Sequence, residues 1–151
     1  MFKKVYVPID NSEISNKILQ EAIDLVKATR AELRISHVID LRYITFGFEK
    51  VGVAELKDAL ISIGKTLIDQ AKAFTDREGI IAEVKLIENH GSDTISLIAD
   101  DAKEFAADLF ILGSHHLNFS SPFVSGGIVD NLVYKTQIPI LLINSSSVII
   151  T

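Results

Sequence analysis

The sequence has no cysteine, and this absence removes several kinds of site at once. Without thiols there can be no disulfide framework, no thiolate nucleophile and no cysteine-ligated zinc or iron–sulfur centre. Absence of cysteine also agrees with a cytoplasmic location. Basic charge is scarce as well, since the formal net charge is −5. Nucleic acids and anionic membranes are bound by basic faces, so we expect neither among the partners.

Long hydrophobic runs are missing too. The longest apolar run has six residues, from Ile138 to Ile143, whereas a membrane-spanning helix needs about 20. The N-terminal run from Val5 to Ile9 has five residues, and a secretory signal needs roughly 7–15. These absences predict a cytoplasmic protein without a membrane segment.

The known nucleotide and hydrolase motifs are also absent. Residues 47–52 have the glycine spacing of a P-loop, but Val53 stands where lysine is required and no strand precedes them. No G-x-G-x-x-G follows a predicted strand, and neither H-E-x-x-H nor G-x-S-x-G occurs. The sequence therefore gives no motif-based reason to expect an enzyme.

What is present is a chain of 151 residues, 48% hydrophobic and 23% charged, which fits one globular domain of residues 1–151. We expect a core of 1–144 and a C-terminal tail of 145–151. Apolar runs predict strands at 4–9, 33–39, 80–87, 109–112 and 139–143. Amphipathic spacing predicts helices at 14–29, 53–74, 95–105 and about 126–133, with a loop at 40–52. We expect 76–79, which ends in glycine, to stop the second helix, and 91–93 to cap the third, whose apolar face includes Ile98. Alternating strands and helices indicate parallel βαβ units, and continuously apolar strands indicate a sheet covered on both faces.

Ligands of such sheets bind beyond the carboxyl ends of the strands. The residues there are Asp10, 37–40, 88–91 and 113–127. Asp10, with Asn11 and Ser12, could cap the first helix or form a turn, and it could equally hold a ligand.

The segment after the fourth strand has two interpretations. Gly113 and Ser114 begin it, and Gly126 and Gly127 open the next helix, as in a loop that cradles a phosphate. An ordinary strand-to-helix loop with serine caps would look the same. The adjacent His115 and His116 have no acidic or cysteine neighbour, so we expect neither a metal site nor a catalytic Ser114–His115 pair. His37 is interpreted as a satisfied core or edge histidine. The aromatic cluster of Tyr43, Phe46 and Phe48 is interpreted as packing under a loop, with a lid over the strand ends as the alternative.

Four segments together resemble the universal stress protein family over essentially the whole chain. They are Lys-Val-Tyr-Val-Pro-Ile-Asp at 4–10, Ser-His-Val-Ile-Asp at 36–40, Leu-Phe-Ile-Leu-Gly-Ser-His at 109–115 and Ile-Pro-Ile-Leu-Leu-Ile at 138–143. The resemblance implies an α/β fold, a doubly wound parallel five-stranded sheet of order 3-2-1-4-5 of the adenine nucleotide alpha hydrolase-like kind. It also implies a homodimer through the strand Pro139–Ile143, which Val148–Ile150 could extend.

Nucleotide-binding members of the family carry G-x-x-G, nine residues, and then G followed by Ser or Thr. Gly113 and Gly126 match this spacing, but His116 replaces the middle glycine and Gly127 the final hydroxyl residue. A side chain at 116 would stand where the backbone must approach ribose and phosphate. By contrast, Gly126 and Gly127 leave the start of the next helix free of side chains, which favours nucleotide binding.

The resemblance thus leaves two functions open, and the departures favour the first. That one is a dimeric stress-response regulatory or protective module without nucleotide, acting through protein partners that the sequence does not identify. The alternative is a switch that binds ATP or AMP with Mg and has at most slow ATP hydrolysis. In the alternative, each part of the nucleotide has its own residues: Asp10 and Val38 for adenine, Pro8 and Ile9 as pocket walls, Gly113, Ser114 and His115 near ribose, and Ser125, Gly126 and Gly127 for phosphate. A plain interaction protein that works through the fifth strand is a third possibility.

Overall fold

The computed structural model describes residues 1–45, 52–114 and 128–144. Its strands form one parallel sheet in the order β3-β2-β1-β4-β5, which confirms the predicted topology. The strands are β1 (Lys4–Pro8), β2 (Glu32–Asp40), β3 (Ala82–Asn89), β4 (Leu109–Gly113) and β5 (Ile140–Ile143). The helices are α1 (Ser15–Thr29), α2 (Arg42–Thr45), α3 (Val53–Arg77), α4 (Thr94–Phe105) and α5 (Ile128–Lys135).

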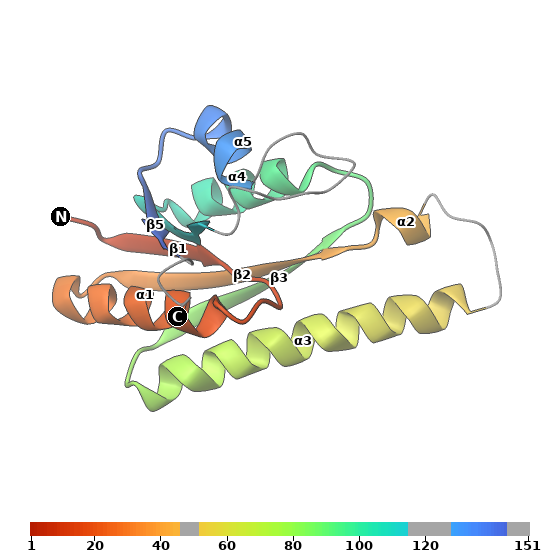
Figure 1. The fold of residues 1–151 in the computed structure, drawn as a ribbon, viewed down its shortest axis with the longest axis horizontal. Helices are drawn as coiled ribbons and strands as arrows, with labels where there is room; N and C mark the ends of the chain where they lie inside the picture. The colour runs from red at the N-terminus through yellow and green to blue at the C-terminus, as the bar shows by residue number, and fades with distance from the viewer. Residues whose placement is uncertain (46–51, 115–127, 145–151) are drawn as a thin grey trace, which may run out of the picture.

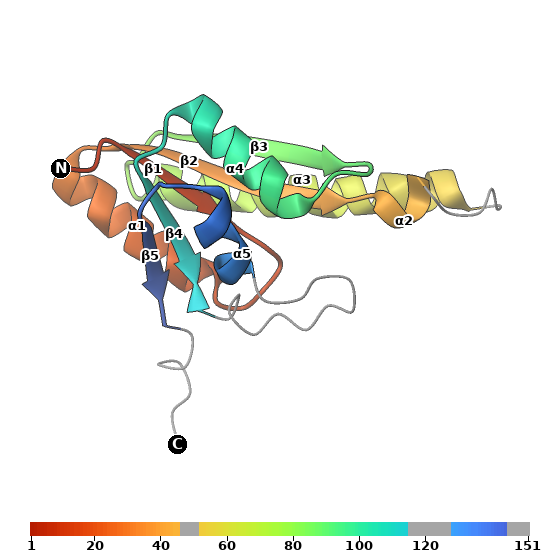
Figure 2. The ribbon, with the colours of Figure 1, turned by 90° about the horizontal axis from the view of Figure 1, so that it is seen from above.

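Helices cover both faces of the sheet, as the apolar strands predict. Alternate residues of β1 point to opposite faces, so Val5 and Val7 join the core beneath α1 and α3, whereas Tyr6 joins the core beneath α4 and α5. Figure 1 shows α1 and α3 on one side of the sheet and α4 and α5 on the other. Figure 2 shows that β2, β3 and α3 extend past the carboxyl end of the shorter strand β1.

Of the predicted boundaries that differ from the structure, two are explained by local hydrogen bonds. The loop prediction for 40–52 is wrong at its start, since α2 occupies part of it. The Asp40 carboxylate accepts a bond of 3.0 Å from the Arg42 amide and pairs with its guanidinium group, which starts that turn. The third strand begins at Ala82 rather than Ile80, because the Ile80 amide closes the end of α3 by donating to the Thr75 carbonyl.

Helix ends match the predictions in two of three places. Asp93 caps α4, with its side chain accepting from the Ile95 amide. Gly79, at φ +77°, follows the end of α3 as expected. The first helix is different, because its N-cap is Ile14 without a side-chain hydrogen bond. Within the described ranges, no helix is long and apolar enough to cross a membrane.

Candidate functional site

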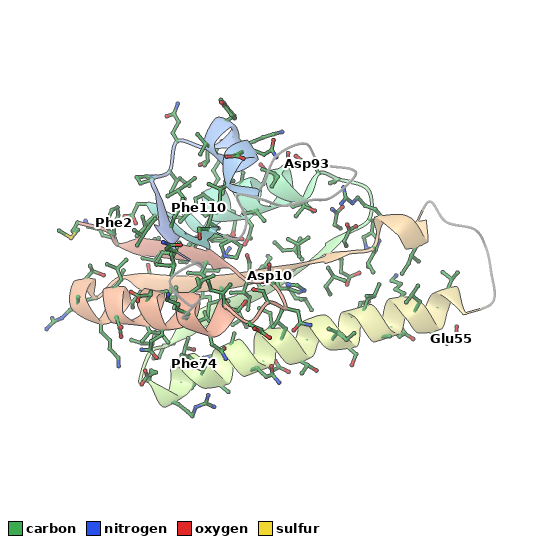
Figure 3. All side chains as sticks on the ribbon, in the orientation of Figure 1. Phe2, Asp10, Glu55, Phe74, Asp93 and Phe110 are labelled. Atoms are coloured by element: carbon green, nitrogen blue, oxygen red, sulfur yellow. The ribbon has the colours of Figure 1, made fainter. Side chains whose placement is uncertain are left out.

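A cavity of about 90 Å³ lies where β1 and β2 end and α4 begins. Figure 3 labels Asp10, where the chain leaves β1, and Asp93, directly before α4. The walls are mainly apolar with a few polar groups, which is typical of small-molecule sites. They consist of Pro8, Ile9, Asp10, His37, Val38, Thr94 and Ile98. The structure therefore brings together four of the residues that the sequence and the resemblance assigned to a base: Pro8, Ile9, Asp10 and Val38.

Asp10 shapes the turn that leaves β1. Its carboxylate accepts a hydrogen bond of 3.0 Å from the Ser12 amide, and its carbonyl accepts one of 2.7 Å from the Ser15 hydroxyl. This is the turn role expected of an aspartate after a strand. Asp10 also lines the cavity, so its role in the turn is compatible with a role in ligand binding.

The backbone N–H and C=O of Val38 lie beyond the point at which β1 ends. The ladder between β1 and β2 stops at the pair Pro8–Ser36, with one further bond of 2.8 Å from the Ile9 amide to the Ser36 carbonyl. Alternate residues of a strand direct their backbone groups to the same side. The N–H and C=O of Val38 thus point past the end of β1, and no described backbone group bonds them there.

His37 is a satisfied histidine, as predicted, and it also lines the cavity. The sequence placed it among the strand-end residues 37–40 but favoured the core or edge role over a ligand role. The Nδ1 of His37 lies 2.9 Å from the Ile9 carbonyl oxygen. A carbonyl can only accept, so Nδ1 carries the proton and Nε2 of the neutral ring is an acceptor.

α4 supplies the two further residues that sequence reasoning missed, Thr94 and Ile98. Ile98 belongs to the apolar face predicted for this helix, and Thr94 directly follows the predicted cap. They could have been predicted as site residues from the expectation that this helix begins beside the carboxyl ends of the strands, where ligands bind.

The structure does not bring the remaining predicted site residues into the cavity wall. Gly113 is the last residue of β4 and pairs with Ile143, and the Ser114 hydroxyl lies 3.5 Å from the Asn144 side-chain oxygen. Both are at the carboxyl edge of the sheet, but neither lines the cavity. His115, His116, Ser125, Gly126 and Gly127 lie outside the described residues.

Charged groups cluster elsewhere, between β2, β3 and α4. Arg34 pairs with Asp101 at 3.1 Å and with Glu104 at 2.6 Å, and Tyr6 donates to Asp101 at 2.6 Å. Hydrogen bonding from Arg34 lowers the pKa of the Glu104 carboxyl. These partners hold α4 against the sheet. Among the described residues, no group of three or more His, Asp or Glu side chains could hold a metal ion.

Comparison with known proteins places this geometry in a family. Residues 1–144 match the model of the universal stress protein family. Among curated relatives, the stress response protein NhaX of Bacillus subtilis is 25% identical, covering 93% of this chain and 96% of its own length. The universal stress protein YxiE of the same organism is 26% identical, covering 95% and 99%.

Solved structures share the fold of this chain. A universal stress protein from Burkholderia pseudomallei superposes with a TM-score of 0.75 at 23% identity, over 93% of this chain and 95% of that one. A universal stress protein solved in complex with cAMP has a TM-score of 0.66 at 18% identity, covering 95% and 97%. One from Archaeoglobus fulgidus, solved in complex with dAMP, has a TM-score of 0.64 at 18% identity, covering 93% and 96%. The chain belongs to the universal stress protein family.

Proposed function

We propose that this protein binds an adenine nucleotide, with the base in the cavity between β1, β2 and α4, and acts as a cytoplasmic regulatory module. The main supporting observation is that the backbone N–H and C=O of Val38, at the cavity wall, have no backbone partner beyond the end of β1 among the described residues. Adenine presents a ring-nitrogen acceptor next to an amino donor. A neighbouring N–H and C=O complement that edge, as expected for a base read by hydrogen bonds.

The remaining cavity walls suit a flat heterocycle. Pro8, Ile9 and Ile98 supply apolar surface for its faces. The Asp10 carboxylate and the Nε2 of His37 add two acceptors, one of which could take the second N–H of the exocyclic amino group. Of the two functions that the sequence left open, this donor and acceptor pattern favours the nucleotide-binding alternative.

A monophosphate fits this chain better than a triphosphate. The sequence departs from the family's nucleotide motif at His116 and Gly127, which are the positions that approach ribose and phosphate in binding members. The residues that the resemblance assigns to adenine, Asp10 and Val38, match the pattern of the binding members. Two structural neighbours were solved with cAMP or dAMP, each of which has a single phosphate group. We expect AMP to bind with an affinity equal to or greater than that of MgATP.

Isothermal titration of AMP, MgATP and GMP into the purified protein tests the proposal. We expect one AMP per chain and no measurable GMP binding, because guanine places a carbonyl where adenine has its amino group. Asp10→Asn keeps the turn acceptor but removes the charge, and it should weaken AMP binding about tenfold. Asp24→Asn, at an exposed acid of α1, is the matched control. Absence of heat up to millimolar AMP would refute the proposal.

We also propose a homodimer formed through the edge of β5. Leu141 and Leu142 of this strand are 42% and 39% exposed, and β5 pairs only with β4 in the described sheet. An unpaired apolar strand edge favours pairing with another strand. The predicted contribution of Val148–Ile150 falls outside the described residues.

A further inference from the structure

We infer that Thr94 is a specificity-determining residue of the cavity, whose hydroxyl donates a hydrogen bond to a ring nitrogen of the bound base and is oriented by Asn89. This inference rests on the proposed nucleotide site. It assigns a second contact to the base, from α4, in addition to the strand edge at Val38. Neither Thr94 nor Asn89 belongs to the motifs by which the sequence resembles its family.

The orientation of the Asn89 amide is fixed by its surroundings. Asn89 ends β3 and is fully buried. Its Oδ1 accepts from the backbone amides of Gly91 at 3.1 Å and Ser92 at 2.8 Å. Backbone N–H groups can only donate, so the atom facing them must be the oxygen. The amide nitrogen therefore faces Thr94, whose Oγ1 lies 3.1 Å away.

This contact dictates where the proton of Thr94 can go. Because Nδ2 of Asn89 donates, the Thr94 hydroxyl must accept, and its own hydrogen is directed elsewhere. Within a helix a threonine often donates to the carbonyl one turn earlier. Thr94 is the first residue of α4 and has no such carbonyl in its helix. No described atom accepts the proton, and the half-buried side chain lines the cavity.

The cavity thus has two polar walls that contact different parts of a base. The Val38 edge on β2 matches the amino group and the adjacent ring nitrogen of adenine. The Thr94 donor comes from α4, which packs over that face of the sheet with Val38 at the margin of the same core. A purine has two further ring-nitrogen acceptors, N3 and N7, and one of them can take the Thr94 proton.

Titration of AMP, 3-deaza-AMP and 7-deaza-AMP against matched variants tests the inference. The wild-type protein should lose about tenfold in affinity for one deaza analogue and little for the other. Thr94→Ser keeps the hydroxyl and should keep this discrimination. Thr94→Val should bind AMP and the sensitive analogue equally.

Asn89→Asp supplies the sharper test. A carboxylate at 89 still accepts from the Gly91 and Ser92 amides, but it cannot donate to Thr94. The threonine should turn its proton to the new carboxylate, and the discrimination should vanish although Thr94 is unchanged. Thermal melting of each variant checks that the fold is retained.

The outcomes separate this inference from the proposed function. If the wild-type protein binds AMP and both analogues alike, or if Thr94→Val keeps the discrimination, the Thr94 contact is refuted and the nucleotide site stands. Equal weakening of all three ligands by Thr94→Val would show a merely structural role and would also refute it. If the wild-type protein binds no AMP, both the site and this contact are refuted.

Discussion

The side chains of Tyr6, Asp101 and Arg34 join three elements that are distant in sequence. Tyr6 is fully buried in β1, and its hydroxyl donates to Asp101 of α4 at 2.6 Å. Arg34 of β2 completes the contact from the other side and stacks 4.6 Å from the centre of the Phe105 ring. Burial, and then the bond to Asp101, raise the pKa of the Tyr6 hydroxyl well above its usual range.

Tyr6→Phe removes the hydroxyl and leaves the buried carboxylate of Asp101 with one partner fewer. We expect it to lower the free energy of unfolding by about 1.5–3 kcal/mol, measured by urea denaturation. Tyr134→Phe is the matched control, because Tyr134 is 90% exposed. The raised pKa of Tyr6 also means that stability is present below the unfolded tyrosine pKa of about 10 and falls above it. Equal stabilities of the two variants would argue against the Tyr6–Asp101 bond.

Asp40 and Arg42 allow a second test at this scale. The hydrogen bond from the Arg42 side chain is the main cause that lowers the pKa of the Asp40 carboxyl, and partial burial opposes it. Because the folded pKa is depressed, the stability from this pair is present above the unfolded value of about 3.9 and is lost as the pH falls through the folded pKa. Arg42→Gln should raise the pKa of Asp40 in an NMR titration of carboxyl shifts, and Arg77→Gln on α3 should not. An unchanged Asp40 pKa in Arg42→Gln would contradict this pairing.

Residues near one another in sequence were the predictable ones. The Asp10 turn and the Asp93 cap follow from two- or three-residue spacing, which a sequence shows directly. The Arg34–Asp101 pair spans 67 positions, so only the folded sheet brings it together. Only the folded structure also brings Thr94 and His37 together, because the cavity that they line forms when α4 packs beside β2.

At the scale of elements, α3 lies against the sheet through a small residue. Gly64 is buried where α3 crosses β2 and β3, and a Cβ built there would lie 2.8 Å from Cδ1 and 2.9 Å from Cγ1 of Ile39. Ile39 is itself only 4% exposed, so its side chain has little room to move. The glycine thus sets how closely the helix approaches.

Gly64→Ala should therefore destabilise the protein despite the better helix propensity of alanine. The propensity gain is about 1 kcal/mol and overpacking costs about 1–3 kcal/mol, so the net loss should be about 1 kcal/mol. Ala73→Gly, at an exposed position of the same helix, calibrates the propensity term. Combining Gly64→Ala with Ile39→Ala should recover part of the loss in a double-mutant cycle. A stabilising Gly64→Ala, or no coupling to Ile39, would contradict the close contact.

The sequence predicted the long elements better than the short ones. The apolar stripe of α3 repeats over many turns and gives a strong periodic signal. α2 has only four residues, too few for a period, and its formation depends on the Asp40 side chain. The shifted start of β3 has a similar cause, because Ile80 is apolar but its amide is used by the end of α3.

At the scale of the whole molecule, the exposed strand β5 is the surface through which we propose that two copies pair. We predict that Leu142→Lys converts a dimer to a monomer in sedimentation equilibrium, because a charge would be buried at the paired edge. Leu56→Lys, at a 53% exposed position of α3, should leave the dimer intact. A monomeric wild-type protein, or a dimer that tolerates Leu142→Lys, would contradict association through this edge.

The overall topology was predictable because parallel βαβ units leave few arrangements open. The site was predictable only in part. Residues at the ends of β1 and β2 meet because parallel strands end at the same edge. The residues at 115–127 that the resemblance assigns to ribose and phosphate lie outside the described residues, and their part in the site stays a prediction.

The central claim is that the Val38 edge reads an adenine base, and the amide resonance of Val38 reports on it most directly. In a ¹⁵N-labelled sample titrated with AMP, we predict a saturable shift of the Val38 amide, together with shifts at Asp10 and Thr94. GMP at the same concentration should leave the Val38 amide unchanged. If millimolar AMP leaves the Val38 amide unmoved, or if AMP and GMP shift it alike, the cavity does not read adenine and the proposed function is wrong.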